Sequence, residues 1–426
     1  MRKRIEAGLA GLRPACAEVL APLPVAERVE ILDAIGRRLQ EALAGDARCP
    51  LARPLQALLA REAVAEGTRA GIEAFAASLR RDAIWALLQE ELGDPRVLDE
   101  FRPRASGGWH RATAPEVTAC FFAGNTPLLA WPPLAAGLLA GSAVFGKLSR
   151  ADTAWPRLFR DATAAVHPDL GRCIALEVWP GGSPEFDAAL CDGADAVVAF
   201  GSDATIAALR ARTPPGTPFH GYGHRLSIAL ILQGADEPEA AAGLARDVLL
   251  YDQQGCLSAS LLFVEGDVDE ATRFGEHLAQ ALDEQAGRWQ LGPRDAEGCA
   301  RVRVVRETAL FAPDARVWGD PGCRWSVLLA PGMRPEPHGG ECVVPIYPFT
   351  EMADLDRLLR PLRAALQGAA VAGPSSRMPA AAEILARAGV SRICAPGALQ
   401  VPSFAWHHNG SSIVRHLLHW TDLETA

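Results

Sequence analysis

The sequence lacks several features that would narrow its function at once. Beyond the three basic residues 2–4, no Lys/Arg-rich run occurs, and the net charge of −9 argues against nucleic acid or an anionic membrane surface as a partner. The ten cysteines form no CxxC pair and have no histidine spacing typical of zinc, which favours reduced thiols, no metal site and a cytoplasmic location. Prolines and Asn125 interrupt the longest uncharged stretch, residues 117–146, and the basic N-terminus has no apolar segment, so we predict neither a transmembrane helix nor an export signal.

What the sequence does contain points to a large α/β protein. Its 426 residues are 49% hydrophobic, which is enough for two or three well-buried cores. Residues 1–104 have helical spacing of apolar positions, so we expect a mostly helical opening region. From residue 106 onwards, short apolar runs at 117–124, 142–148, 173–180 and 195–201 alternate with helical stretches. This alternation predicts a parallel sheet covered by helices.

A second series of elements follows a proline- and glycine-rich break at residues 212–225. We predict strands at 226–232, 258–266, 301–307, 325–331 and 343–349, and helices at 236–254, 269–285 and 352–368. The chain is therefore expected to contain two α/β domains. With nucleic acid disfavoured by the charge, a small molecule is the expected substrate.

Cys256 is the cysteine with the most informative position. It follows Gly255, which we expect to end the preceding helix in the left-handed conformation, and it precedes a predicted strand. A thiolate at such a junction could attack a carbonyl, and the Cys256 N–H could help to hold the oxyanion. The helix C-terminus would raise the pKa of the thiol, and no cation is adjacent in sequence, so a structural cysteine stays open as the alternative.

Three further junctions carry polar groups that can be interpreted in two ways. Gly201 and Ser202 follow a predicted strand and begin a helix, so they could bind a phosphate, or Ser202 could be an ordinary N-cap. Asn125 could donate to an oxyanion or occupy a turn. Lys147 and Arg150 end an apolar strand and could face a ribose or a phosphate, or they could be solvated charges.

Two later segments offer groups for acid–base or ribose chemistry. His407 and His408 lie in "WHHNG", where one imidazole could act as acid or base, although a hydrogen-bonded structural pair explains them equally well. Glu341 in "PHGGEC" could contact a ribose or be a loop carboxylate. The segment "HGYGHR" (220–225) lacks the third glycine of a dinucleotide fingerprint and precedes a strand, so it is given no phosphate role.

Taken in order, the segments "AGNTP", "GKLSR", "PGGSPEFDAAL", "AFGSDATI", "GYGHRLSIALI" and "DQQGCLSAS" resemble the aldehyde dehydrogenase superfamily. The likeness is closer to its acyl-CoA reductase branch, the LuxC-type fatty acid reductases. It includes "HHNG", where that branch usually has Asp in place of Asn409. The likeness spans about residues 106–420.

The resemblance implies an aldehyde-dehydrogenase-like α/β fold with four parts. Residues 1–104 would be a helical region packed with the nucleotide-binding domain, residues 105–225 that domain itself, and residues 226–398 the catalytic cysteine domain. Residues 399–426 would return to the first domain or to an oligomer interface. The family pattern also implies a small oligomerisation element and hence a homo-oligomer.

The resemblance also implies roles for single residues. Cys256 matches the catalytic cysteine and Asn125 the oxyanion asparagine. Gly201 and Ser202 match the loop that meets the nicotinamide and the pyrophosphate, and Lys147 matches the lysine on the adenosine ribose.

Two departures from the family pattern bear on the reaction. Hydrolytic members carry a glutamate base in the segment that reads "HGYGHR" here, whereas this chain has Gly221 near that place and no carboxylate. Oxidation to a free acid is therefore disfavoured. NAD-preferring members often have a glutamate where this chain has Arg150, and a cation there would attract a 2′-phosphate, which favours NADPH.

The resemblance therefore implies an NADPH-dependent oxidoreductase that reduces a fatty acyl-CoA or a carrier-bound acyl thioester to the aldehyde, through an acyl intermediate on Cys256. A CoA-acylating or other aldehyde dehydrogenase, and a reductase of acyl phosphates or adenylates, would share Cys256 and differ in the leaving group. A non-catalytic acyl-binding scaffold is the alternative from another class. An acyl-donating partner protein could supply the substrate.

Overall fold

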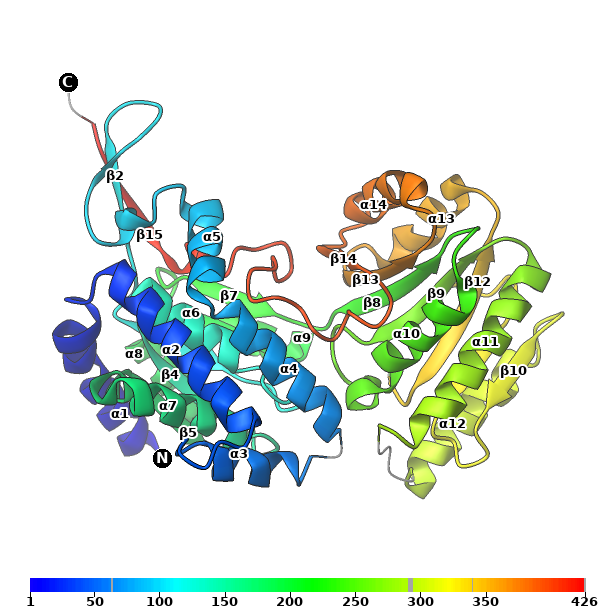
Figure 1. The fold of residues 1–426 in the computed structure, drawn as a ribbon, viewed down its shortest axis with the longest axis horizontal. Helices are drawn as coiled ribbons and strands as arrows, with labels where there is room; N and C mark the ends of the chain where they lie inside the picture. The colour runs from blue at the N-terminus through cyan, green and yellow to red at the C-terminus, as the bar shows by residue number, and fades with distance from the viewer. Residues whose placement is uncertain (63, 290–293, 339, 425–426) are drawn as a thin grey trace. The chain divides into compact units, whose positions relative to one another are not determined.

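The computed structural model describes all residues except 63, 290–293, 339 and 425–426. Contacts among the described residues divide the chain into two compact units, coloured by residue number in Figure 1. The first unit comprises residues 1–61, 68–224 and 403–426. The second comprises residues 62–67 and 225–402. The chain therefore leaves the first unit after His224 and returns to it at Ser403.

The opening region is helical, as its apolar spacing predicts. Its helices are α1 (Arg2–Ala15) with a π-helical extension (Cys16–Leu20), α2 (Val25–Leu43), α3 (Ala52–Leu59), α4 (Ala65–Ser78) and α5 (Arg81–Leu92). Val29, Leu32, Ile35 and Leu39 of α2 are at most 1% exposed, at the three- and four-residue spacing of one helix face. α2 packs against α6 and α7, whereas α1 packs against β4 and α8 (Figure 1).

The sheet of the first unit is parallel throughout, which confirms the predicted architecture. Its strand order is β5–β4–β3–β6–β7. The strands are β3 (Val117–Phe121), β4 (Ala143–Leu148), β5 (Ile174–Val178), β6 (Ala196–Phe200) and β7 (Phe219–Tyr222), joined by α6 (Trp131–Ala140), α7 (Ala154–Val166), α8 (Pro184–Gly193) and α9 (Asp203–Arg212). Every residue of β3 and β6 is buried, as expected for central parallel strands covered on both faces.

A small antiparallel sheet in the same unit joins distant parts of the chain. It consists of β1 (Arg102–Pro103), β2 (Trp109–Thr113) and β15 (His419–Leu423), with β2 in the middle. The segment before β15 is held by Glu91 of α5, whose buried carboxylate accepts the backbone N–H groups of Ile413, Val414 and Arg415 at 2.7, 2.9 and 2.8 Å. One side chain thus satisfies three consecutive backbone donors.

The second unit contains a seven-stranded sheet in the order β10–β11–β12–β9–β8–β13–β14. Its strands are β8 (Leu226–Ile231), β9 (Ala259–Glu265), β10 (Arg316–Gly319), β11 (Ser326–Leu329), β12 (Val343–Phe349), β13 (Leu366–Ala372) and β14 (Arg392–Cys394). Only the pairing of β10 with β11 is antiparallel among these described strands. Apolar residues of α10 (Glu237–Leu249) and α11 (Val268–Ala286) pack on one face, and those of α13 (Met352–Leu359) and α14 (Met378–Arg387) pack on the other.

Two of the predicted elements in this unit are wrong. Residues 301–307 were expected as a strand, but they lie inside α12 (Ala296–Ala309), which Asp295 caps by accepting the Gly298 N–H at 2.7 Å. Val302 and Ala309 of this helix are buried on one side, which is a helical and not an alternating pattern.

The predicted helix at 352–368 is likewise too long. It ends at Leu359, continues as a short 3-10 turn (Arg360–Leu362) and gives way to β13 at Leu366. Pro361 lies at this break, where its missing N–H and fixed φ prevent a regular helix from continuing.

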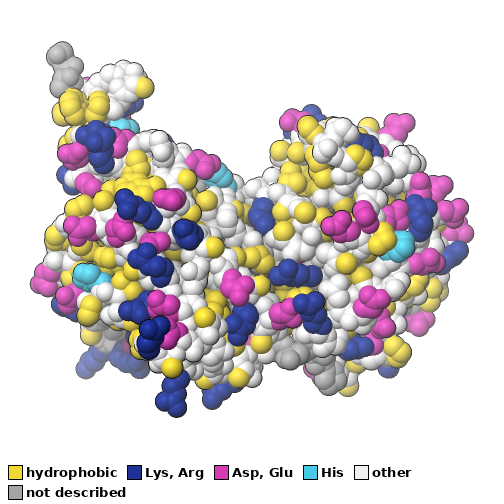
Figure 2. All heavy atoms as spheres, in the orientation of Figure 1, with side chains coloured by type: hydrophobic (Ala, Val, Ile, Leu, Met, Phe, Trp, Pro, Cys, Tyr) yellow, Lys and Arg dark blue, Asp and Glu magenta, His cyan; other side chains and the backbone are white. Residues whose placement is uncertain are grey.

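The surface carries charges of both signs. Figure 2 shows basic and acidic side chains interspersed over the visible face, in line with the modest net charge of −9. Within the described residues no single helix is long and apolar enough to cross a membrane. One pair of consecutive helices in this part of the chain, Arg2–Leu20 and Val25–Leu43, is long and apolar enough when the two are taken together, and the pair is bent by 108°.

Candidate active site

Cys256 lies in a turn between α10 and β9, in the second unit. The predicted left-handed cap at Gly255 is wrong, because α10 ends at Leu249 and Gly255 has no positive φ. Instead, Tyr251, Asp252 and Gln253 have φ values of 57°, 52° and 58°. Three consecutive non-glycine residues in the left-handed region are strained, each at a cost of about 1 kcal/mol or more, so the surroundings must hold them in place.

Asp252 is held by a bidentate ion pair. The Arg294 guanidinium donates to both Asp252 carboxylate oxygens at 3.1 and 2.9 Å, and its side chain is only 9% exposed. The same guanidinium donates to the carbonyls of Cys323 and Arg324 at 2.7 and 3.1 Å. Arg294 therefore ties the strained segment to the turn between β10 and β11.

Gln253 holds the same segment against the sheet. Its buried amide nitrogen donates to the carbonyls of Ala259 and Val343 at 2.8 and 3.2 Å, and its amide oxygen accepts the Val343 N–H at 3.0 Å. The side chain thus bridges the first residues of β9 and β12 and replaces a ladder contact between them. This arrangement fixes the residues immediately before Cys256.

Gly255 has a close neighbour. A Cβ at this position would lie 3.0 Å from Oε1 and 3.3 Å from Nε2 of Gln400. The Gln400 amide donates to the hydroxyl of Ser258 and, at 3.5 Å, to the carbonyl of Asp247. Glycine therefore allows Gln400 to pack on the turn, and a left-handed φ is not the reason for it.

Asp247, on α10, anchors the segment that carries Gln400. Its fully buried carboxylate accepts the N–H groups of Gly397 and Leu399 at 2.6 and 3.0 Å. Burial raises the pKa of Asp247 to about 7, although these backbone hydrogen bonds act in the opposite direction.

The Cys256 thiol is half-buried and strongly perturbed. Burial raises the pKa of Cys256 to about 11, while hydrogen bonds from its own N–H and from that of Leu257, and the charge of Arg225, act to lower it. The Cys256 carbonyl accepts a hydrogen bond from the Ser227 hydroxyl at 2.9 Å, so the backbone orientation of the residue is fixed. The N–H groups of Cys256 and Leu257 thus favour negative charge on the sulfur, as their lowering of its pKa indicates.

The first unit presents its predicted residues at the carboxyl edge of its parallel sheet. Asn125 is exposed in the loop after β3, and Lys147 is the penultimate residue of β4, opposite Glu177 of β5. Burial lowers the pKa of the Lys147 ammonium, partly offset by the charge of Asp187. Such edges are where doubly wound sheets bind nucleotides.

The loops after β3 and β4 approach each other closely. A Cβ on Gly124 would lie 2.5 Å from Oγ of Ser149, so only glycine fits there. Asn125 follows Gly124 in the first loop, and Arg150 follows Ser149 in the second, so both residues lie next to this contact in sequence. Arg150 is exposed.

Gly201 and Ser202 lie between β6 and α9. The Ser202 hydroxyl accepts the Thr205 N–H at 3.2 Å and is the N-cap of α9. Asp203 accepts the His224 N–H at 2.9 Å in the same first turn. The N-cap interpretation is confirmed for Ser202, and its phosphate contact stays a prediction.

The two adjacent histidines differ in their surroundings. His407 is exposed, whereas His408 stacks on Tyr222 and on Trp406 with ring centroids 4.4 and 4.7 Å apart. Tyr222 in turn stacks on Phe200 at 4.8 Å. This column of rings brings the C-terminal segment to the ends of β6 and β7, and it gives His408 a packed position that the sequence did not predict.

Glu341 lies in the turn before β12, in the second unit. Its Oε1 accepts from Nε and Nη2 of Arg301 at 2.8 and 2.6 Å. The next residue, Cys342, is buried, and its thiol donates to Oδ1 of Asp252 at 3.4 Å. Glu341 is therefore adjacent to the strained segment that leads to Cys256, while its ribose contact stays a prediction.

The structure thus groups the predicted residues in two sets. Asn125, Lys147, Arg150, Gly201, Ser202, His407 and His408 belong to the first unit, and Cys256 and Glu341 to the second. Their combination into one catalytic site stays a prediction. Within the described part of the chain no group of three or more His, Cys, Asp or Glu residues is arranged to hold a metal ion.

Sequence reasoning did not identify Asp252, Gln253, Arg294 and Gln400. The first two lie in the quoted segment "DQQGCLSAS", and a run of polar residues beside a candidate nucleophile was the available signal. Nothing local marks Arg294, which is 42 residues from Asp252.

Comparisons with known proteins agree on one family. The sequence profile of the acyl-CoA reductase (LuxC) family matches residues 21–420. The long-chain acyl-protein thioester reductase of Aliivibrio fischeri is 27% identical over 256 residues, which are 59% of this chain and 52% of that protein. The protein of the same name from Vibrio harveyi is 28% identical over 190 residues, 44% of this chain and 40% of that protein. The chain spans about half the length of the curated relatives it matches.

Solved structures show the same fold. Glyceraldehyde-3-phosphate dehydrogenase GapN from Methanocaldococcus jannaschii, solved with NADP, matches with a TM-score of 0.72 and 14% identity, over 99% of this chain and 94% of that one. An assigned aldehyde dehydrogenase from Burkholderia cenocepacia matches with a TM-score of 0.73 and 17% identity, over 99% and 92%. The predicted aldehyde-dehydrogenase-like fold is thereby confirmed.

Proposed function

Because the chain belongs to the acyl-CoA reductase (LuxC) family, we propose that it reduces an acyl thioester to the aldehyde through an acyl intermediate on Cys256, with NADPH as reductant. The observation that carries this proposal is the Cys256 turn, where a half-buried thiol meets two backbone N–H groups in front of a parallel strand. A purely structural cysteine needs neither the donors nor the strained segment before it.

The proposed covalent step uses groups of this chain alone. The Cys256 sulfur, as thiolate, attacks the acyl carbonyl and forms a carbon–sulfur bond, and the bond to the donor sulfur breaks. The donor leaves as a thiolate that takes up a proton. The Cys256 N–H, together with the Asn125 amide, stabilises the negative oxygen of the tetrahedral intermediate.

The absence of a carboxylate from residues 220–225 supports reduction and acyl exchange over hydrolysis. In the structure these residues form the end of β7 and the connection to β8. With no carboxylate there, this segment supplies no general base to activate water against the acyl-Cys256 thioester. The intermediate therefore persists long enough to be reduced.

The first unit has groups that suit a nicotinamide dinucleotide. Half-buried Lys147 carries a charge whose burial is unfavourable, and an anionic or ribose partner would offset that penalty. Ser202 and the first turn of α9 would face the pyrophosphate and Arg150 a 2′-phosphate. Glu341, which belongs to the second unit, would contact a ribose hydroxyl. When bound, the nicotinamide would supply the hydride for the reduction.

The donor of the acyl group is proposed to be a protein-bound or CoA thioester. The Aliivibrio fischeri and Vibrio harveyi relatives are named as reductases of acyl-protein thioesters, which favours a protein donor and hence an acyl-transferring partner. We also propose a homo-oligomer that works in the cytoplasm, with His407 or His408 available for proton transfer.

The test is NADPH consumption by the purified protein with acyl-CoAs of short, medium and long chain, and with the same acyl groups on a carrier protein. Aldehyde formation in the wild type, absent in Cys256→Ala with NADPH binding retained, is the expected result. Activity that survives in Cys256→Ala would overturn the role of Cys256. NADPH binding without reduction of any acyl thioester would exclude the proposed reaction.

A further inference from the structure

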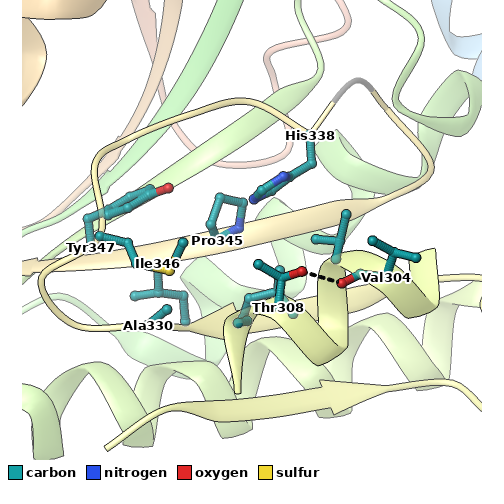
Figure 3. A pocket seen from close by; sticks show the side chains of 11 residues that line it. Val304, Thr308, Ala330, His338, Pro345, Ile346 and Tyr347 are labelled. Carbon is teal, nitrogen blue, oxygen red and sulfur yellow. Dashed lines mark hydrogen bonds between the residues drawn. The ribbon is translucent and has the colours of Figure 1, made fainter. Parts of the chain in front are cut away.

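A second feature of the Cys256 unit is an apolar cavity of about 200 Å³ between α12 and the strands β11 and β12. Figure 3 shows Val304 and Thr308 of α12 on one side, and Ala330, Pro345 and Tyr347 from the strand side, with His338 near the loop above them. Neither the family comparison nor the candidate site accounts for this cavity.

The two hydroxyl groups that line the cavity already have hydrogen-bond partners within the protein. The Thr308 hydroxyl donates to the Val304 carbonyl at 2.7 Å, as the dashed line in Figure 3 shows. The Tyr347 hydroxyl donates to the Arg334 carbonyl and accepts the Glu336 N–H, both at 3.3 Å. Burial lowers the pKa of His338, which disfavours a charged ring in the cavity, while the charge of Glu336 acts in the opposite direction. A ligand therefore finds no free charge here, which selects for hydrocarbon.

The rim of the cavity is also apolar, and it is exposed. Val304 and Met333, which line the cavity, are 65% and 41% exposed, and Leu310 and Phe311 just beyond α12 are 53% and 89% exposed. Exposed apolar side chains that are gathered in one segment mark binding sites more often than single scattered ones do.

The cavity is within reach of Cys256. Ile346, another lining residue, pairs with Leu262 of β9, which is six residues after Cys256. Six residues span at most roughly 20 Å, which is comparable with the extended length of a long-chain acyl group. Val343, three residues before Ile346, is held by Gln253 in the segment that precedes Cys256.

We propose that this cavity binds the far end of the acyl chain whose carbonyl is attached to Cys256, and that it sets the preference for chain length. The proposal rests on the function proposed above. Ala330, at the end of β11, has the smallest possible apolar side chain on this wall, so a larger residue there would shorten the space that a chain can occupy.

Direct binding is tested with cis-parinaric acid, a fatty acid that fluoresces when it leaves water, and its displacement by tetradecanoic and butanoic acids. We expect the wild type to bind the probe, and tetradecanoic but not butanoic acid to displace it. Ala330→Phe, which fills the cavity, and Met333→Glu, which places a charge at its exposed rim, should each weaken binding at least tenfold. Ala386→Phe, at an exposed position of α14, adds the same bulk elsewhere and should change nothing.

Unchanged probe affinity in folded Ala330→Phe and Met333→Glu would overturn the proposal. If Ala330→Phe does not fold, Met333→Glu decides alone, because its side chain is exposed. In turnover assays, Ala330→Phe should lower kcat/KM for tetradecanoyl-CoA at least tenfold and leave butanoyl-CoA unchanged, and equal losses would also overturn the proposal. If the wild type reduces no acyl thioester, the reaction proposed above fails, while probe binding still tests the cavity.

Discussion

The Cys256 thiol is largely protonated at neutral pH. A pKa of about 11 means that only a very small fraction is thiolate at pH 7, and the neighbouring N–H groups do not overcome the cost of burial. A nucleophile in this state reacts slowly until a further donor or cation approaches. The pH dependence of its alkylation measures this directly.

The alkylation rate of Cys256 by iodoacetamide should rise with pH past pH 9 and level off only near pH 11. The physical reason is that the thiolate, whose fraction grows tenfold per pH unit below the pKa, is the reacting species. Peptide mass spectrometry at Cys256 gives the rate in the presence of the other cysteines. A plateau near pH 7 would show that the sulfur is activated in the free protein.

Asp252→Ala should destabilise the second unit by about 1–3 kcal/mol, because it leaves the largely buried Arg294 guanidinium without its carboxylate and the strained segment without its anchor. Urea unfolding measures the loss. Glu237 makes a comparable bidentate pair with Arg273 at 3.1 and 2.8 Å, where the arginine is 54% exposed. Glu237→Ala should cost no more than about 1 kcal/mol, and equal losses in the two variants would contradict the special role of Asp252.

At the scale of elements, the turn before β9 shows why a glycine can be misinterpreted. Glycine after a helix is most often a left-handed cap, and the sequence offers no sign that Gln400, far along the chain, would pack on Gly255 instead. A need for a left-handed backbone and a need for space beside Gln400 predict different effects of Gly255→Ala when Gln400 is also replaced.

Gly255→Ala should cost about 1–3 kcal/mol because its Cβ crowds the Gln400 amide, and the second substitution Gln400→Ala should recover most of that loss. A double-mutant cycle by urea unfolding gives the coupling energy. If the cost of Gly255→Ala is the same with and without Gln400, the glycine is needed for its backbone conformation and not for space.

The strands of both sheets could be predicted because they are short apolar runs buried on both faces. β3, β6 and β8 are buried at every position, so their sequences leave no alternative. α12 was misinterpreted because "RVRVVRE" alternates like a strand, while only the packing shows that Val302 is buried and Val304 is 65% exposed. Short alternating segments do not specify their structure without their neighbours.

Glu91→Gln should loosen the segment before β15. A glutamine offers one acceptor oxygen in place of a carboxylate that receives three backbone N–H groups, so we expect a loss of about 1.5–3 kcal/mol. Amide exchange at Ile413, Val414 and Arg415 should become faster. Glu90→Gln, one residue earlier and exposed on α5, is the matched control and should leave this exchange unchanged.

At the scale of the whole molecule, Asp247 should make the stability of the second unit fall as pH rises. The pKa of Asp247 in the folded protein, about 7, lies above its ordinary value, so the folded state binds the proton more tightly than the unfolded state does. Ionisation of Asp247 therefore does not lower the free energy of unfolding below about pH 4, and it lowers that free energy by the full amount above about pH 7. At 1.36 kcal/mol per pKa unit, the effect is at most about 4 kcal/mol. Urea unfolding of the wild type and Asp247→Asn at pH 5 and 8 isolates it; parallel pH dependences in the two proteins would exclude it.

The candidate site could be predicted only where its residues lie in local motifs. Cys256, Asn125 and Lys147 each stand at the end or start of an apolar strand, and that position is visible in the sequence. The groups that hold the Cys256 turn come from Asp252, Arg294 and Gln400, which meet only after folding. Sequence patterns show which local segments are periodic, whereas contacts between distant segments produce no periodic pattern in the sequence.

The return of residues 403–426 to the first unit has a consequence for the order of synthesis. Thr113 of β2 pairs with His419 of β15, about 300 residues later, and the whole of residues 225–402 is translated between them. A ribosome that has passed Pro402 has therefore produced every residue of the second unit, while β2 is paired with β1 at most and still lacks β15. Synthesis of the unit that carries Cys256 therefore ends before the first unit receives β15.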